Sequence, residues 1–289
     1  MRRMIVGLAA AVAAVAAVGA PNAMAGYTGG FAAFDQCPVH TAHVNGCIYS
    51  PTESGEVTLG KQSVPIVNTQ VLQGGLLRPE EEFIKRLAPA LNGETLSKTA
   101  QKVPGGLAGL VKCNEISGSG LVEKALRASC ELVFENGLTG VNATTELAAP
   151  AGSVVLNSAA EQSGEGTALT LPIKVKLENP LLGSDCYIGS ESEPITLKLT
   201  TGATGGGGPT GSPGTQSTKE EGGILVISGV SLVSNSFSAP KASGCGPLGL
   251  LDGTVDSQIG LPSAAGNNTA ILNGKVEIAN SEIVEEREE

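Results

Sequence analysis

Strict alternation of apolar and polar residues constrains this chain to a fold dominated by β-strands. Within residues 169–177 of the 289-residue sequence, every second residue is aliphatic, and the residues between them are polar or proline. Residues 195–199 repeat the pattern with Ile and Leu alternating with Thr and Lys. Because successive side chains of a strand point to opposite faces of its sheet, each stretch predicts a strand with one buried and one solvated face.

Further stretches predict more strands and the turns between them. Residues 126–134 show the same alternation and predict a strand on which Cys130 faces the core. Residues 224–227 are continuously apolar, which indicates a central strand covered on both faces. The Asn-Gly pairs at 136–137 and 273–274 are typical of tight hairpin turns, because both residue types tolerate positive φ angles.

Helical patterns are a minority. Residues 79–87 begin with a proline and three glutamates, which predicts a short helix with its acidic residues at the positive N-terminal end. Residues 247–257 predict a second short helix. Taken together, the patterns indicate a mainly β protein: an antiparallel β-sandwich-like, disulfide-stabilised fold with one or two short helices.

The N-terminus has the features of a cleavable signal peptide. Arg2 and Arg3 precede an apolar run at residues 5–18, and residues 23–25 form a small-x-small cleavage site. An apolar run of 14 residues is shorter than the roughly 20 that a membrane span requires. A lipoprotein anchor would need a cysteine directly after the cleavage site, where Gly26 stands.

The signal peptide defines the expected domains and location. We expect cleavage after residues 1–25, leaving residues 26–289 as one secreted β-rich domain. Sub-domains at about 26–150 and 151–280 are an alternative. The mature chain is expected to be secreted, either extracellular or associated with the cell wall, and to lack a transmembrane anchor.

The even number of cysteines is consistent with an exported protein. Six cysteines in an exported chain are expected to form disulfides, and six cysteines allow 15 complete pairings. Chain proximity suggests the pairs Cys37–Cys47, Cys113–Cys130 and Cys186–Cys245. The third pair closes the longest loop, which is expected to stabilise the fold by about 4 kcal/mol.

Composition argues against several function classes. The formal charge is −10, or −12 without Arg2 and Arg3, and no basic cluster is present, so nucleic acid is not an expected partner. The chain has five Phe, three Tyr and no Trp, which disfavours a sugar-binding aromatic platform. Asp252 and Asp256 flank Gly-Thr-Val, which is interpreted as a helix start or turn rather than a calcium loop.

A glycine-rich stretch at residues 202–214 is either a domain linker or a long exposed loop. A disulfide between Cys186 and Cys245 would span it, which favours the loop. The stretch lacks the Lys-Ser/Thr ending of a phosphate-binding loop.

One segment, residues 37–47, resembles a site because it holds both histidines and two cysteines. His40 and His43 are weak candidates for metal ligands, since two thiolates could complete a zinc or copper set. Oxidised cysteines cannot serve as thiolate ligands, so a disulfide-closed surface loop is the better explanation. We therefore expect no metal and no cofactor.

Nucleophilic catalysis would also depend on these two histidines. A Ser-His-Asp arrangement would need His40 or His43, with Asp35 as a candidate orienting residue, but no Gly-x-Ser-x-Gly elbow marks a nucleophile. The Ser-x-x-Lys pattern at 238–241 lacks its accompanying motifs and is interpreted as a chance match. Paired glutamates for glycoside cleavage remain open, because such pairs meet in space and not in sequence. No catalytic residue is assigned.

Two stretches carry a resemblance to known sequences. Residues 182–202 contain Gly-Ser-Asp-Cys-Tyr-Ile-Gly-Ser, and residues 244–246 are followed by Gly-Leu-Pro-Ser-Ala-Ala-Gly-Asn-Asn-Thr. Over residues 182–279 the chain resembles a group of secreted actinobacterial proteins of unknown function. The resemblance implies the secreted class and brings no activity, ligand or catalytic residue.

The leading functional hypothesis is a non-enzymatic extracellular or cell-envelope protein that acts through binding or structural contacts. Its partner would be an envelope component or another protein. One alternative is a secreted hydrolase that uses scattered carboxylates or a site at His40 and His43. Another is a carrier that binds a lipid or small molecule in an apolar cavity between its sheets.

Overall fold

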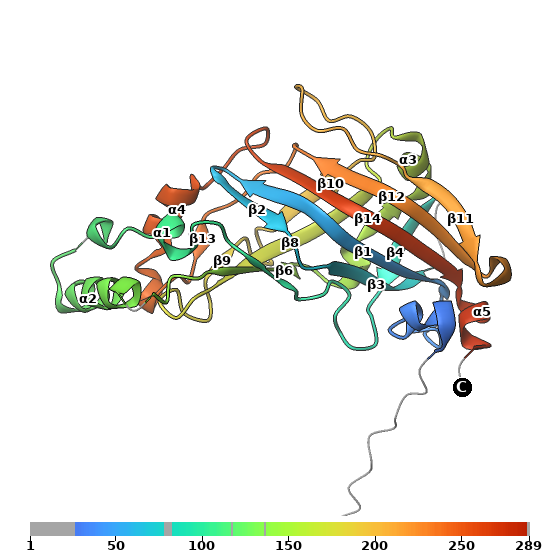
Figure 1. Ribbon diagram of the computed structural model, residues 1–289, viewed down its shortest axis with the longest axis horizontal. Helices are drawn as coiled ribbons and strands as arrows, with labels where there is room; N and C mark the ends of the chain where they lie inside the picture. The colour runs from blue at the N-terminus through green and yellow to red at the C-terminus, as the bar shows by residue number, and fades with distance from the viewer. Residues whose placement is uncertain (1–26, 78–82, 117, 136, 288–289) are drawn as a thin grey trace, which may run out of the picture.

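The protein is described by a computed structural model over residues 27–77, 83–116, 118–135 and 137–287. The expected signal peptide, residues 1–25, lies outside the described residues. The described chain is mainly β, with antiparallel strands, three disulfides and a few short helices, as the alternation predicts. Figure 1 shows an elongated molecule whose long strands run along its length.

The strands form two layers. In the first layer, β14 lies between β12 and β1, and β1 continues to β3 and β2. Its strands are β1 (Val44–Leu59), β2 (Gln62–Ile66), β3 (Gln70–Leu77), β11 (Thr215–Lys219), β12 (Ile224–Ser234) and β14 (Thr269–Asn280).

The second layer is built around β8, which pairs with β6, β7, β9 and β10. Its strands are β5 (Ala100–Lys102), β6 (Asn142–Leu147), β7 (Val155–Asn157), β8 (Leu169–Glu178), β9 (Tyr187–Ile188), β10 (Ile195–Leu199) and β13 (Ala242–Ser243). A short strand, β4 (Ile84–Ala88), pairs with β3 of one layer and β7 of the other, and so joins the two.

The main core lies between the layers and is built from aliphatic side chains, as the shortage of aromatic residues requires. The odd-numbered residues of β8 point inward, from Leu169 to Leu177, and each is at least nine-tenths buried. Ile195, Leu197 and Leu199 of β10 stand beside them and are fully buried. The two alternating stretches therefore form adjacent strands with one common inner face.

The helices gather at the two ends of the molecule (Figure 1). At one end lie α1, α2 and α4, and at the other lie η1 and α5 with the two chain termini of the described protein. The helices are η1 (Gly29–Phe34), α1 (Gly106–Leu110), η2 (Cys113–Glu115), α2 (Leu121–Glu135), η3 (Ala151–Ser153), α3 (Ser158–Ser163), η4 (Glu220–Gly222), η5 (Pro247–Gly249), α4 (Asp252–Ile259) and α5 (Ser281–Glu285).

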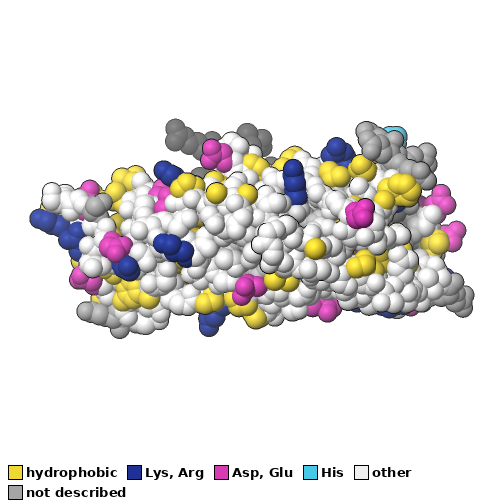
Figure 2. All heavy atoms as spheres, turned by 90° about the horizontal axis from the view of Figure 1, so that it is seen from above, with side chains coloured by type: hydrophobic (Ala, Val, Ile, Leu, Met, Phe, Trp, Pro, Cys, Tyr) yellow, Lys and Arg dark blue, Asp and Glu magenta, His cyan; other side chains and the backbone are white. Residues whose placement is uncertain are grey.

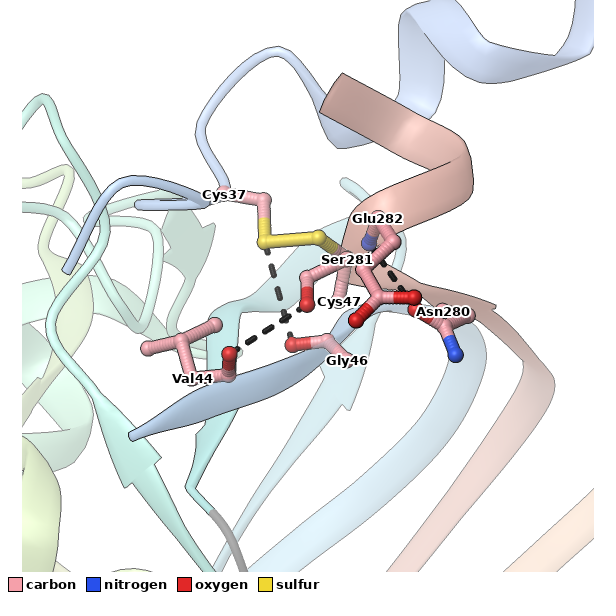
Figure 3. Close-up of a disulfide and its surroundings, with 7 residues drawn as sticks. All are labelled: Cys37, Val44, Gly46, Cys47, Asn280, Ser281 and Glu282. Atoms are coloured by element: carbon pink, nitrogen blue, oxygen red, sulfur yellow. Dashed lines mark hydrogen bonds between the residues drawn. A yellow bond between two sulfur atoms is a disulfide. The ribbon is translucent and has the colours of Figure 1, made fainter. Parts of the chain in front are cut away.

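A second, smaller core covers the outer face of the first layer. Phe31 and Phe34 of η1 and Val284 of α5 pack there against Ile224 and Val226 of β12. The Cys37–Cys47 disulfide ties this N-terminal segment to β1, and Figure 3 shows it beside the start of α5. In that close-up, Ser281 Oγ donates a hydrogen bond to the Val44 carbonyl at 3.2 Å.

The interpretation of residues 126–134 as a strand is wrong, because they belong to helix α2. Leu126 and Cys130 are four residues apart, a spacing that shares one face in a helix as well as in a strand. Both are buried, while Leu132, which a strand would also have turned inward, is 58% exposed. Cys130 thus faces the core as expected, for a different reason.

The Asn-Gly pair at 273–274 does not form a hairpin turn, and Asn136 of the other pair lies outside the described residues. The pair at 273–274 lies in the middle of β14, where an added Cβ on Gly274 would collide with the Pro51 carbonyl oxygen of β1. Glycine is needed there for close approach between strands. Gly137 follows helix α2 with a φ of 70° and donates its N–H to the Phe134 carbonyl, so it ends a helix instead.

The helix expected at residues 79–87 is also wrong where it is described, since Ile84–Ala88 is strand β4. Residues 78–82 lie outside the described residues. The helix expected at 247–257 is present as η5 followed by α4. The glycine-rich stretch 202–214 is a loop between β10 and β11, and Ala203 and Thr210 form a bridge within it.

Candidate ligand-binding site

A cavity with a volume of about 90 Å³ lies between the two layers. Inward side chains of β1, β2 and β3 form one wall, and those of β6, β8, β9 and β10 form the other. All five inward residues of β8, from Leu169 to Leu177, line it. At a rise of about 3.3 Å per residue, this wall extends over about 26 Å. The lining of this cavity, called the slot below, therefore extends along the whole length of β8.

The walls are mostly hydrocarbon. Among the described residues that line the cavity, aliphatic side chains outnumber polar ones by nineteen to six, and none is charged or aromatic. Leu110 of α1 and Ile259 of α4 also contribute, so the helices at one end of the molecule contact this space. An apolar cavity of this kind tends to stay free of water and to accept apolar guests.

The charges of the second layer are directed away from the cavity. Lys174 and Lys176 alternate with the inward residues of β8, and their Nζ atoms lie 3.8 Å from Glu146 Oε2 and 3.3 Å from Glu178 Oε1. The hydrogen bond to Glu178 raises the pKa of Lys176 above its ordinary value. Figure 2 shows acidic and basic side chains interspersed over one face of the molecule.

A small polar cluster interrupts the hydrocarbon on the two facing walls. Gln70 of β3 stands opposite Thr52 of β1 in the strand register, and both side chains line the cavity. From the other layer, Thr145 of β6 reaches the same place, since its Oγ1 lies 3.5 Å from Gln70 Nε2. Ser50, two residues before Thr52, donates its Oγ hydrogen to the Lys275 carbonyl at 3.2 Å.

Gln101 is a second buried amide on the cavity wall, and its hydrogen bonds serve the backbone. Its Oε1 accepts from the N–H groups of Val67 at 2.9 Å and Asn68 at 3.0 Å. Its Nε2 donates to the Asn68 carbonyl at 2.6 Å. This amide joins β5 of one layer to the end of β2 in the other.

The histidines expected as weak metal candidates lie outside this cavity. Cys37 and Cys47 form a disulfide, and His40 Nδ1 lies 3.2 Å from Glu285 Oε1 of α5. His43 has a positive φ of 70° in the turn before β1. Within the described part of the chain, no group of three or more His, Cys, Asp or Glu residues could hold a metal ion.

Three aspartates of interest in the sequence accept hydrogen bonds from backbone N–H groups. Asp35 Oδ1 accepts the Tyr27 N–H at 2.9 Å, although it was a candidate orienting residue for a histidine. Asp252 begins α4 and accepts the Cys245 N–H, and Asp256 accepts the Ala242 N–H, both at 2.7 Å. Burial raises the pKa of Asp256 above its ordinary value.

The remaining cysteines form the other two bonds, Cys113–Cys130 and Cys186–Cys245. All three disulfides join the pairs that chain proximity suggests, and the third spans the glycine-rich loop. Over the described residues, no helix is both long and apolar enough to cross a membrane.

The sequence interpretation did not single out Gln70 or Thr145. Each residue is a polar side chain on the inward face of a strand, and the sequence shows this only once the strand and its inward face are known.

The fold and cavity define an antiparallel β-sandwich-like protein with an apolar interior slot. No family model, curated protein or solved structure matches the chain.

Proposed function

We propose that this protein is a secreted, non-enzymatic binding protein that carries a slender aliphatic ligand between its two sheets. The observation that carries the proposal is the slot itself, which is lined by aliphatic side chains from both layers over the whole length of β8. A carrier is one of the alternatives that the sequence leaves open, and the slot supports it over a protein that acts through surface contacts.

The shape and chemistry of the slot select the class of ligand. Hydrocarbon walls stabilise a bound alkyl chain by about 25 cal/mol for each Å² of apolar surface removed from water. Planar ring systems gain less here, since the described lining offers no aromatic side chain for stacking. An unbranched chain suits a space that is long and narrow.

The slot is small beside the roughly 300–1,000 Å³ of ordinary ligand pockets. A volume of about 90 Å³ accommodates a short alkyl segment without rearrangement. A longer chain requires the aliphatic side chains to move apart. The carrier therefore has a contracted empty state and an expanded loaded state.

Secretion is part of the same proposal. Three disulfides are compatible with an oxidising compartment outside the cytoplasm, and the N-terminal sequence has the features of a signal peptide. In an aqueous compartment a free aliphatic molecule is poorly soluble, so a protein that encloses one has an evident use.

The test is uptake of deuterated decane by the purified protein. After equilibration and desalting, gas chromatography with mass detection is expected to find about one decane for each chain. Leu197→Phe adds volume inside the slot and is expected to reduce uptake at least about fivefold, at a cost of about 1–3 kcal/mol in stability. Lys198→Phe, on the outer face of the same strand, is the matched control and should retain uptake.

Thermal unfolding of each variant shows whether it is folded. If Leu197→Phe does not fold, Val57→Leu offers a smaller addition to the opposite wall, on β1. Absence of decane uptake by the wild-type protein overturns the proposal, as does equal uptake by wild type and a folded slot-filling variant.

A further inference from the structure

We propose that the ligand ends in, or contains, an uncharged hydrogen-bond donor such as a hydroxyl, and that Gln70 is the residue that recognises it. This inference rests on the proposed function and specifies the ligand of the same cavity. It follows from the unequal hydrogen bonding of Gln70 and Gln101, the two glutamines of the slot wall that are buried.

Gln70 is buried, with 9% of its surface exposed, yet its amide is poorly satisfied. Its Nε2 has two contacts, to the Thr99 carbonyl and to Thr145 Oγ1, and both are 3.5 Å long. No hydrogen bond from the described residues reaches its Oε1. An acceptor on the slot wall that has no protein partner can accept a hydrogen bond from a ligand bound beside it.

Gln101 shows that an amide on this wall can be fully engaged. It is 3% exposed, and its three hydrogen bonds to the backbone lie between 2.6 and 3.0 Å. Burial in the slot therefore does not by itself leave a glutamine short of partners. The difference identifies Gln70 as the amide left free for a guest.

The orientation of the Gln70 amide determines which ligand group can form a hydrogen bond with it. The Thr99 carbonyl can only accept a hydrogen bond, so the nitrogen of the Gln70 amide faces it and Oε1 is the free acceptor. A ligand group that donates a hydrogen satisfies Oε1. An ether or ester oxygen does not, because it has no hydrogen to give.

The same surroundings exclude a ligand with a charged head group. The described lining of the slot contains neither a cation to pair with a carboxylate nor an anion to pair with an ammonium group. Burial of an ion without a partner is strongly unfavourable. The neutral hydroxyls of Thr52 and Thr145 beside Gln70 fit an uncharged head instead.

The test compares three probes of similar size: decane, 1-decanol and 1-methoxynonane. Their dissociation constants are measured for the wild type and for Gln70→Leu. We expect 1-decanol to bind Gln70→Leu about five- to tenfold more weakly than wild type, which is the range of one net hydrogen bond. Decane and 1-methoxynonane should bind the variant at least as well as the wild type.

Gln73→Leu is the matched control, because Gln73 lies on the same strand and its amide donates to the Glu94 carbonyl away from the slot. If Gln70→Leu does not fold, Gln70→Met preserves the length of the side chain. Equal loss of 1-decanol and 1-methoxynonane binding in a folded variant overturns the inference but leaves the carrier proposal standing. No binding of any probe to the wild type overturns both.

Ionisation provides an independent readout. Decanoic acid should bind more weakly as pH rises through about 5 and the carboxyl group ionises, whereas 1-decanol should show no such change. Equal binding of ionised decanoate and 1-decanol contradicts the requirement for a neutral head.

Discussion

The side chain of Gln101 and the backbone of Asn68 join the two layers of the protein at an edge where no strand pairing in the described residues does so. Gln101 Nε2 donates to the Asn68 carbonyl at 2.6 Å, and Gln101 Oε1 accepts the Asn68 N–H at 3.0 Å. In return, Asn68 Nδ2 donates to the Ala100 carbonyl at 2.8 Å. Gln101 also lines the slot, so these bonds lie at its edge.

Removing the Gln101 hydrogen bonds should weaken the contact between the two layers at this edge. We expect Gln101→Ala to lower the free energy of unfolding by about 1–3 kcal/mol, since it deletes three hydrogen bonds. Chemical denaturation measures this change, and stopped-flow exchange of decane should become faster. Gln73→Ala removes a single exposed bond and should change either quantity little. Slower exchange in Gln101→Ala would contradict a role for this edge in access.

The environment of Glu277 leads us to expect that the folded protein loses stability in acid. It is 4% exposed, and its Oε1 accepts from Lys275 at 2.7 Å and Lys219 at 3.0 Å. Burial alone would raise the pKa of Glu277, but the two lysine hydrogen bonds outweigh it and hold the pKa below the ordinary value of 4.5. The interaction therefore stabilises the fold above about pH 4.5, and this contribution is lost as pH falls through the lowered folded-state pKa.

Urea unfolding of wild type and Glu277→Gln at pH 7 and at pH 3 measures this contribution. We expect Glu277→Gln to be less stable by about 1–3 kcal/mol at pH 7, with a smaller difference at pH 3. Glu56→Gln, at an exposed position on the same layer, is the control. If the stability difference between wild type and Glu277→Gln is the same at both pH values, the ion pairs with the two lysines are not its cause.

Glycine is required at position 274 because β14 lies very close to β1 there. A Cβ at this position would meet the Pro51 carbonyl oxygen, which is backbone and cannot rotate away. Gly274→Ala should therefore destabilise the protein by at least about 2 kcal/mol, because the central pairing of β1 with β14 must shift. Gly140→Ala, which places its Cβ in open space, should leave the thermal midpoint nearly unchanged.

The three disulfides should differ in their contributions. Cys186 and Cys245 are 59 residues apart, and Cys37 and Cys47 are 10 apart. Loop-closure entropy predicts losses of about 4 and about 3 kcal/mol when each pair is replaced by alanine. Denaturation of the two double variants compares these losses directly. A greater loss from the Cys37–Cys47 pair would show that its packing against η1 and α5 outweighs loop length.

Local periodicity accounts for the parts of the fold that were predictable. Strands β8 and β10 follow directly from alternation, because a sheet with one buried face imposes a period of two on its residues. The same reasoning fails for α2, where Leu126 and Cys130 satisfy both a strand and a helix. At the second Asn-Gly pair, the turn propensity of two residues is overridden by the long pairing of β14 with β1 and β12.

Three features follow from the sequence alone: the mainly β class, the alternating inner faces of β8 and β10, and an aliphatic core. Each of these depends on neighbouring residues or on composition. Two features depend on the three-dimensional fold: β1 and β8 face each other across a slot, and Gln70 and Thr145 meet within it. Those residues are 75 positions apart and lie in different layers, so their proximity depends on how the strands pair and stack.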